Sequence, residues 1–296
     1  MKKYFLLFIC IGFVVASMKS QTTTQSNAVN NNNTLLWKIS GKNALPSYLY
    51  GTFHLLCKED IHFGAATDAA MAAVKEVYME LDLDDPGAML SGIMYMNMQD
   101  GKKLKDFYTE AEFKRVEDYF NDTLKTPLAM FQKIKPYFLA ALLYPKMLAC
   151  EDVSGVDQEL SKKAKKNNTP ITGLETVQFQ ASVFDSIPYE WQAKELLKNI
   201  DSARQYKIEF AKMVKAYTAH QLDAMESMVD SSGFTADKFD DILLKKRNLA
   251  WAEKLDSVMA ATPVFIAVGA GHLIGEKGLI QLFRKKGFTV TAVMDN

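Results

Sequence analysis

Short apolar runs occur near both ends of the chain, and the long stretch between them carries apolar residues at helical spacing. Toward the N-terminal end, residues 35–40 and 48–53 predict two strands, and the turn-forming residues between them predict a hairpin at the edge of a sheet. Toward the C-terminal end, residues 264–268 form an uninterrupted apolar run, which is typical of a buried strand, and residues 288–293 predict a last strand. Strands are therefore expected to cluster at the two ends of the chain.

The middle of the chain is mostly helical in pattern. Residues 65–77 place alanines, Met71 and Val74 at helical spacing, and a strand is predicted after them at residues 77–82. Helices are predicted within 87–150, 155–166 and 189–260, with one short strand at 170–174. We therefore predict an α/β (α+β) fold, in which a mixed sheet is built from strands of both chain ends and a large central helical insertion occupies about residues 87–150 and 188–260.

The first residues have the pattern of a secretory signal peptide. Lys2 and Lys3 precede an apolar run, residues 4–16, that is too short to span a membrane comfortably. We expect residues 1–20 to be removed, with cleavage between about Ala16 and Gln21. This predicts an exported protein, periplasmic or extracellular, with no stable membrane span in the mature chain.

Residues 21–34 are almost entirely Thr, Gln, Ser and Asn, so they cannot bury apolar area and predict a disordered leader. Residues 35–296 are then expected to form a single domain. The chain as a whole has 35 basic and 35 acidic residues, with 48% hydrophobic residues. That composition is typical of a globular protein, and it lacks the basic excess that nucleic-acid binding requires. The oligomeric state is left open.

Two of the four histidines close apolar strands through the same spacing, Gly-x-x-His. Gly51 precedes His54 in this way, and Gly269, with Gly271 inside the motif, precedes His272. Glycine permits positive φ and lets the backbone approach a neighbouring group closely. Strand ends that lead into helices are where α/β proteins bind ligands. We therefore expect the fold to bring His54 and His272 together.

Glu80 interrupts an otherwise apolar predicted strand and is the natural third member of the site. Two histidines and a carboxylate are a common way to hold a divalent metal with an open position for water. His54, His272 and Glu80 are therefore the predicted catalytic and metal-binding residues, with Mn²⁺, Co²⁺ or Zn²⁺ as the cofactor. Glu80 could instead act as a general base or fix a histidine tautomer.

Two further charged residues are expected to support this site. Glu175 is predicted at a helix start, where a carboxylate is stabilised by the helix dipole in any case. Arg247 lies in the last predicted long helix, and an arginine in a cleft could bind a substrate carboxylate through two hydrogen bonds.

Several motifs together resemble those of the TraB/GumN family: Gly51-Thr-Phe-His54, Glu80-Leu-Asp82, Gly173-Leu-Glu-Thr-Val-Gln178, Arg247-Asn248 and Val268-Gly-Ala-Gly-His-Leu273. That family includes the pheromone-shutdown proteins and the Tiki proteases that clip Wnt ligands. The resemblance covers residues 35–293 and implies a fold related to erythromycin esterase and the haem-binding ChaN proteins. For the Tiki branch it implies a metal-dependent protease that uses His54, His272 and Glu80.

The sequence thus favours an exported metal-dependent hydrolase, most readily a peptidase, that acts on a peptide or small-molecule substrate. The alternative is a non-catalytic binding protein for haem or a peptide signal, because the same histidines could hold haem iron. A dinucleotide-binding loop at Gly269 is disfavoured, because only 21 residues follow Gly275, which leaves no room for a βαβαβ half. A thiol enzyme using Cys57 is disfavoured, because nothing around this cysteine indicates an ionised thiol.

Overall fold

The computed structural model describes residues 33–41, 45–82, 87, 92, 94–231, 239 and 241–295. The predicted signal peptide and all but the end of the predicted leader lie outside the described residues. Within the described part of the chain, no helix is long and apolar enough to cross a membrane.

The described residues divide into two compact units. One unit, called the helical unit below, comprises residues 81–153 and 175–211. The other, called the sheet unit, comprises residues up to Glu80 together with residues 154–174 and 212–295. The sequence-based prediction of one domain over residues 35–296 stays a prediction.

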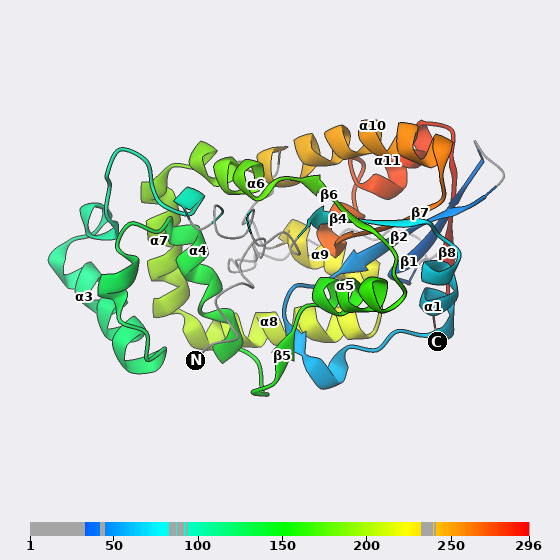
Figure 1. Cartoon of the computed structure of the whole chain (residues 1–296). Coiled ribbons are helices and arrows are strands. Elements are labelled where there is room, and N and C mark those ends of the chain that lie inside the picture. Colours follow the sequence, from blue (N-terminus) through cyan, green and yellow to red (C-terminus); the bar gives the residue numbers. More distant parts are fainter. Residues whose placement is uncertain are drawn as a thin grey trace. The chain divides into compact units, whose positions relative to one another are not determined.

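A six-stranded mixed sheet forms the centre of the sheet unit, and its strand order is β6-β4-β7-β2-β1-β8 (Figure 1). The strands are β1 (Leu36–Ser40), β2 (Ser47–Thr52), β4 (Glu76–Leu81), β6 (Ile171–Glu175), β7 (Val264–Gly269) and β8 (Thr289–Val293). β7 is parallel to both β2 and β4, whereas β1 is antiparallel to β2 and β8. The prediction of a mixed sheet built from both chain ends is confirmed.

The β1–β2 hairpin is present, but it does not lie at the edge of the sheet as predicted. β8 pairs with the outer side of β1, and β7 pairs with β2. The reason is the apolar character of the hairpin: Leu36, Leu49 and Tyr50 are all nearly fully buried. Strands this apolar are favoured in the interior of a sheet, where both sides are paired.

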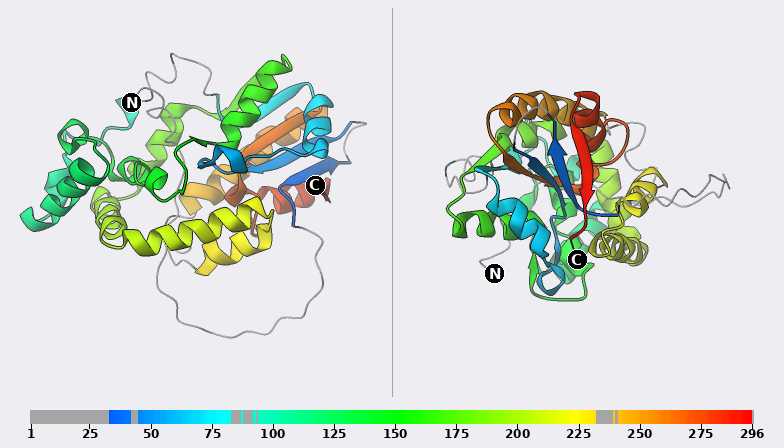
Figure 2. Two further views of the ribbon diagram at one scale, coloured as in Figure 1. Left: turned by 90° about the horizontal axis from the view of Figure 1, so that it is seen from below. Right: turned by 90° about the vertical axis from the view of Figure 1, so that its right-hand side faces the viewer.

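Helices cover both faces of this sheet. Both views of Figure 2 place α1 (Ala65–Ala72) and α5 (Val156–Lys166) on one side of the strands, with α9 (Leu222–Ser231) and α11 (Leu279–Lys285) on the other. α10 (Lys246–Ala261) packs beside α11. In α10, Trp251, Leu255 and Met259 are buried at intervals of four residues, which gives the helix one apolar face.

Shorter elements complete the sheet unit. They are η1 (Lys58–Asp60), the π-helical turn η7 (Asp241–Lys245), the 3₁₀ turn η8 (Ala270–His272), and the two-stranded sheet of β3 (Leu56–Cys57) with β5 (Val153–Ser154). α11 begins at Leu279. Gly275 has φ +79°, a left-handed conformation that interrupts the chain before the helix.

The helical unit consists of short helices and single turns. They are η2 (Leu104–Phe107), α3 (Glu110–Asp118), η3 (Tyr119–Thr123), η4 (Leu128–Phe131), α4 (Pro136–Ala141), η5 (Tyr144–Lys146), α6 (Val177–Val183), η6 (Phe184–Ser186) and α7 (Tyr189–Asp201), and α8 (Ala203–Thr218) contributes residues to both units. The buried Lys135 ammonium links several of these turns, because it donates to Tyr95 O at 2.8 Å and Ala181 O at 2.7 Å and pairs with Asp185 at 2.8 Å.

Two glycines bring the ends of β2 and β7 together. A Cβ atom on Gly51 would lie 3.2 Å from Cα and Cβ of Ala270 and 3.1 Å from Leu273 Cδ2, so the first Gly-x-x-His motif packs directly on the second. Gly269, in turn, faces His54 of the first motif, since its Cβ would lie 3.7 Å from His54 Nε2. Neither glycine has positive φ. Close approach, rather than an unusual backbone conformation, is therefore what these positions require.

Replacing Gly51 by alanine is expected to destabilise the fold by about 1–3 kcal/mol, because the added methyl group must displace the backbone of Ala270. Gly271→Ala is the matched control, since no atom lies within 4 Å of its Cβ position, and it should change the free energy of unfolding by less than ~0.5 kcal/mol. Urea denaturation of the two variants measures both values. Equal effects would show that the contact between the motifs does not depend on Gly51.

Candidate functional site

The fold brings together three of the residues predicted for the site. His54 follows β2, Glu80 lies near the end of β4, and His272 ends η8, directly after β7. Because β7 lies between β2 and β4 and is parallel to both, these residues meet at the carboxyl ends of three neighbouring strands. That edge is where ligands bind in open α/β sheets. Glu80 and His272 are 6% and 4% exposed, whereas the side chain of His54 is 15% exposed.

The space left by the missing side chain of Gly269 is the centre of the cluster. From the position that a Cβ would take there, Glu80 Oε1 is 3.3 Å away, and His54 Nε2 and His272 Cδ2 are each 3.7 Å away. The Gly269 amide donates a hydrogen bond of 2.8 Å to Glu80 Oε1. His272 Nε2 lies 3.7 Å from the same oxygen. A side chain at position 269 would occupy the space between these groups.

Arg247 lies inside the cluster rather than at a substrate-facing position. Its Nη2 donates to Glu80 Oε2 at 2.9 Å, and its Nη1 donates to the carbonyl of Leu243 at 2.9 Å and lies 3.4 Å from His272 Nε2. The guanidinium also stacks on Trp251, with 4.7 Å between Cζ and the ring centroid. Arg247 is thus paired with the protein's own carboxylate, and its binding of a substrate carboxylate stays a prediction.

Asn248 fixes the orientation of His272. The Asn248 amide nitrogen donates to the carbonyls of His272 (3.2 Å) and Lys277 (2.9 Å), so its oxygen must be the atom that faces the imidazole. That oxygen is 2.6 Å from His272 Nδ1, which therefore carries the proton. His272 Nε2 is therefore unprotonated, and its lone pair faces Arg247 and Glu80. Trp251 packs against the same imidazole, with ring centroids 4.4 Å apart.

The two imidazoles have opposite electrostatic surroundings. Burial lowers the pKa of His272 to about 3, and this outweighs the opposite effect of the Glu80 carboxylate. Burial also opposes a charge on His54, but the carboxylates of Asp157 and Glu80 outweigh it and raise the pKa to about 8. At neutral pH, His54 is therefore protonated and His272 is neutral. Such a separation of pKa values is typical of acid–base sites.

The pKa of Glu80 is lowered from its ordinary value, so the carboxylate is ionised at neutral pH. Burial by itself would raise this pKa. The Arg247 guanidinium, the protonated His54 imidazole and the Gly269 amide stabilise the charged form more strongly than burial opposes it.

The donor atoms fit a divalent metal ion in kind and orientation. His54 Nε2 and Glu80 Oε1 face the gap at Gly269, His272 Nε2 lies 3.7 Å from the same carboxylate oxygen, and the Nδ1 atom of each ring faces an oxygen, as is usual for metal-binding histidines. In the described part of the chain, however, no three His, Cys, Asp or Glu side chains converge closely enough to hold a metal ion as they stand. Arg247 contacts both Glu80 and His272, and it therefore competes with an ion for two of the three ligands.

Other residues singled out from the sequence have different positions. Glu175 ends β6, and the residue that caps the following helix is Thr176, whose hydroxyl accepts from the amide of Phe179 at 3.1 Å. Cys57 and Cys150 are both disulfide-bonded, so Cys57 is not a free thiol nucleophile. Gly271 has no atom near its Cβ position and is not required by packing.

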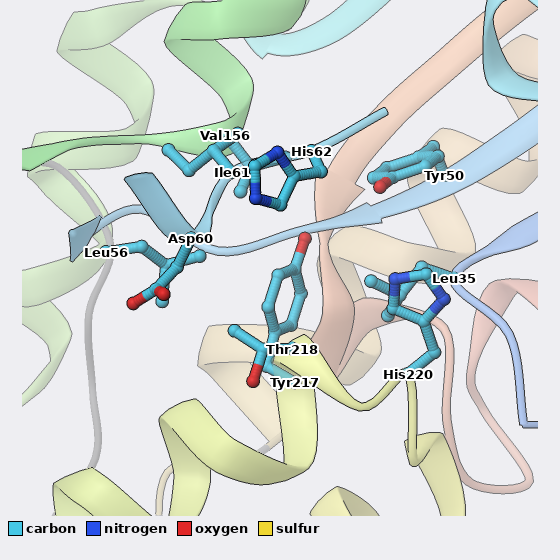
Figure 3. A pocket seen from close by; sticks show the side chains of 10 residues that line it. All are labelled: Leu35, Tyr50, Leu56, Asp60, Ile61, His62, Val156, Tyr217, Thr218 and His220. Atoms are coloured by element: carbon cyan, nitrogen blue, oxygen red, sulfur yellow. The ribbon is translucent and has the colours of Figure 1, made fainter. Parts of the chain in front are cut away.

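The two remaining histidines do not contribute to the cluster. His62 and His220 line a separate cavity of about 60 Å³ (Figure 3). Figure 3 shows both of them around the ring of Tyr217, whose hydroxyl donates to the carbonyl of Gly51 at 2.8 Å.

Comparison with known proteins agrees with the motifs. A metalloprotease TIKI homolog from Nematostella vectensis is 20% identical over 92% of this chain and 70% of its own length. Metalloprotease TIKI1 from Danio rerio is 21% identical over 87% of the chain and 63% of its own length. The uncharacterized protein YbaP from Escherichia coli is 28% identical over 44% of the chain and 48% of its own length. No solved structure matches.

The sequence pattern of the TraB/PrgY/gumN family matches residues 35–292. This match includes both Gly-x-x-His motifs, Glu80 and Arg247. Because it covers most of the chain, the protein belongs to the TraB/PrgY/gumN family.

Proposed function

We propose that this protein is a metal-dependent hydrolase that cleaves peptides. The observation that carries the proposal is the meeting of His54 Nε2, His272 and Glu80 around the gap at Gly269. The distant relatives that are named metalloproteases support peptide bonds as the substrate class.

In this proposal, His54, His272 and Glu80 hold a divalent ion, Mn²⁺, Co²⁺ or Zn²⁺. A bound ion of this kind would lower the pKa of a coordinated water and polarise the substrate carbonyl. The protein itself supplies fixed ligands: Asn248 holds His272 with Nε2 unprotonated, and the Gly269 amide orients the Glu80 carboxylate. Glu80 is also the group that could accept the proton of the attacking water. Arg247 must give up at least its contact with His272 Nε2 for all three ligands to be available.

A metal-free hydrolase is the second candidate, and the contacts of Arg247 favour it. The guanidinium already supplies a fixed positive charge beside Glu80 and His272, at the place that an ion would otherwise occupy. In this alternative, protonated His54 donates a proton to the leaving group, Glu80 accepts one from water, and Arg247 stabilises negative charge that develops on the substrate.

Calorimetric titration of the metal-free protein with Mn²⁺, Co²⁺ and Zn²⁺ tests the first proposal. We expect one ion to bind per chain, and we expect His54→Ala and His272→Ala to lose this binding because each removes a ligand. His62→Ala is the matched control, since that histidine lines the separate cavity and should leave the affinity unchanged.

A peptide-library cleavage assay with the metal-loaded protein follows. Glu80→Gln should reduce turnover by roughly 10²–10⁴-fold, the usual contribution of a general base. Cleavage that persists after chelation would contradict the metal-dependent proposal and favour the metal-free one. If the protein neither binds an ion nor cleaves peptides, both fail, and a shift of the haem Soret band on mixing would then identify the binding-protein alternative.

The pH dependence distinguishes the two hydrolase proposals, because they need His54 in opposite states. A metal ligand must be unprotonated, so metal affinity should rise with pH until about the pKa of His54, near 8, and then level off. A proton donor must be protonated, so metal-free cleavage should fall as pH rises through the same value. Rates and affinities measured over this range decide between them, and a profile without an inflection near this pKa contradicts both roles of His54.

We also propose that the chain is exported, on the basis of the lysines and the apolar run in residues 2–16. Expression of the full chain in a Gram-negative host should give a shortened protein outside the cytoplasm. Its N-terminus, determined by mass spectrometry, should lie between Ser17 and Gln21. An intact N-terminus in the cytoplasmic fraction would contradict export.

A further inference from the structure

We infer that Asp157, at the start of α5, is a positioning residue that orients the imidazole of His54. Asp157 Oδ2 lies 3.4 Å from His54 Nδ1. The inference rests on the proposed function only in giving His54 a role in the site. The orientation itself follows from contacts that no metal or substrate is needed to make.

The first residues of α5 hold the segment that carries His54 through the backbone as well. The amide of Val156 donates a hydrogen bond of 2.9 Å to the carbonyl of Phe53, the residue before His54. Gly155, the N-cap of α5, approaches so closely that a Cβ on it would lie 2.8 Å from the His54 carbonyl oxygen. Three consecutive residues, Gly155 to Asp157, therefore contact the two residues at positions 53 and 54.

Gly155 also makes room for the Asp157 carboxylate. A Cβ at Gly155 would lie 2.4 Å from Asp157 Oδ1, a distance that real Cβ atoms do not reach. The backbone of Gly155 is extended, with φ −89° and ψ 145°, which any residue can adopt. Glycine is thus required here by the Asp157 carboxylate and by the His54 carbonyl oxygen, and not by backbone strain.

A purely structural explanation accounts for Asp157 less well than it accounts for its neighbour Glu159. Both lie in the first turn of α5, where acidic groups stabilise a helix. Glu159 accepts from Ser154 and Lys162, both at 2.6 Å. Asp157 Oδ1, by contrast, is buried and has no hydrogen-bond partner among the described residues, while Oδ2 faces His54. Burying a carboxylate oxygen in this way is unfavourable unless the other oxygen makes a strong contact.

The consequence for the site is a fixed tautomer. With Nδ1 of His54 protonated toward Asp157, the neutral imidazole has its lone pair on Nε2, the nitrogen that faces the gap at Gly269. His272 is held in the same tautomer by Asn248. Both imidazoles thus leave Nε2 unprotonated, each through a different oxygen partner: His54 Nε2 faces the gap, and His272 Nε2 faces Arg247 and Glu80. Partners of this kind typically change the metal affinity of a site by about 10–100-fold.

Nitrogen-15 NMR of histidine-labelled, metal-free protein tests the inference without any activity assay. Above the pKa of His54, near 8, we expect its signals to report protonated Nδ1 in the wild type. The signals are assigned by their loss in His54→Gln. In Asp157→Leu, which removes the acceptor, we expect the proton to move to Nε2. Glu159→Leu is the matched control, because it removes a carboxylate from the same helical turn and should leave the tautomer unchanged.

Gly155→Ala provides a second test that changes no polar group, and it remains informative if Asp157→Leu does not fold. The added methyl group should displace the carboxylate and also press against the His54 carbonyl oxygen, so it disturbs both contacts of Gly155 and should lower the population of the protonated-Nδ1 tautomer. An unchanged tautomer in both variants, or the same change in Glu159→Leu, would overturn the inference.

Metal titration of these variants separates this inference from the proposed function. If the wild type binds an ion, Asp157→Leu should weaken binding by about 10–100-fold. If the tautomer changes in the variants but the wild type binds no ion, the positioning role is supported and the metal-dependent function is contradicted. If the tautomer does not change but the wild type binds an ion, the metal-dependent function is supported and the positioning role is contradicted.

Discussion

The charge on Glu80 is the constraint on which the rest of the cluster depends. A carboxylate that is 6% exposed must be compensated inside the protein, and Arg247 and the Gly269 amide provide that compensation. Removing one partner of such a buried pair typically costs about 3–5 kcal/mol, because the other charge is left without compensation. The Arg247 guanidinium is held in place by its hydrogen bond to Glu80, and it in turn lies next to His272 Nε2.

The pairing of Arg247 with Glu80 also bears on whether a metal ion can bind at this cluster. A guanidinium and a divalent ion are both positive, and they would share Glu80 and His272 at contact distance. Either Arg247 moves when an ion binds, or the arginine itself provides the positive charge that the reaction needs. The Leu243 carbonyl, which accepts from Nη1, belongs to the π-helical turn η7, and such turns occur frequently at functional sites. A change in this turn is one way in which the guanidinium could be released.

The sheet and the strand ends that carry the two histidines could be predicted from the sequence, because local patterns of apolar residues determine them. Apolar runs that end in Gly-x-x-His placed His54 and His272 at strand ends, and the strands at both ends of the chain form one mixed sheet. The direction of Glu80 could not be predicted, because a shift of one residue in a strand turns a side chain to the other face. The partners of Arg247 and His54 were also missed. Asp157 is 103 positions from His54, and an acidic residue at a helix start has a sufficient local explanation.

Because β2 and β7 come from opposite ends of the chain and pair with each other, the cluster can form only late in synthesis. During synthesis, β2 and His54 are made early, but β7, the strand on which β2 pairs, begins only at Val264. Until then, one side of the apolar strand β2 has no partner, and unpaired strand edges of this kind promote aggregation. For most of its synthesis, the growing chain therefore contains His54 and Glu80 but lacks His272. Pairing over so long a sequence separation also favours slow folding, which prolongs the time for which this strand edge is exposed.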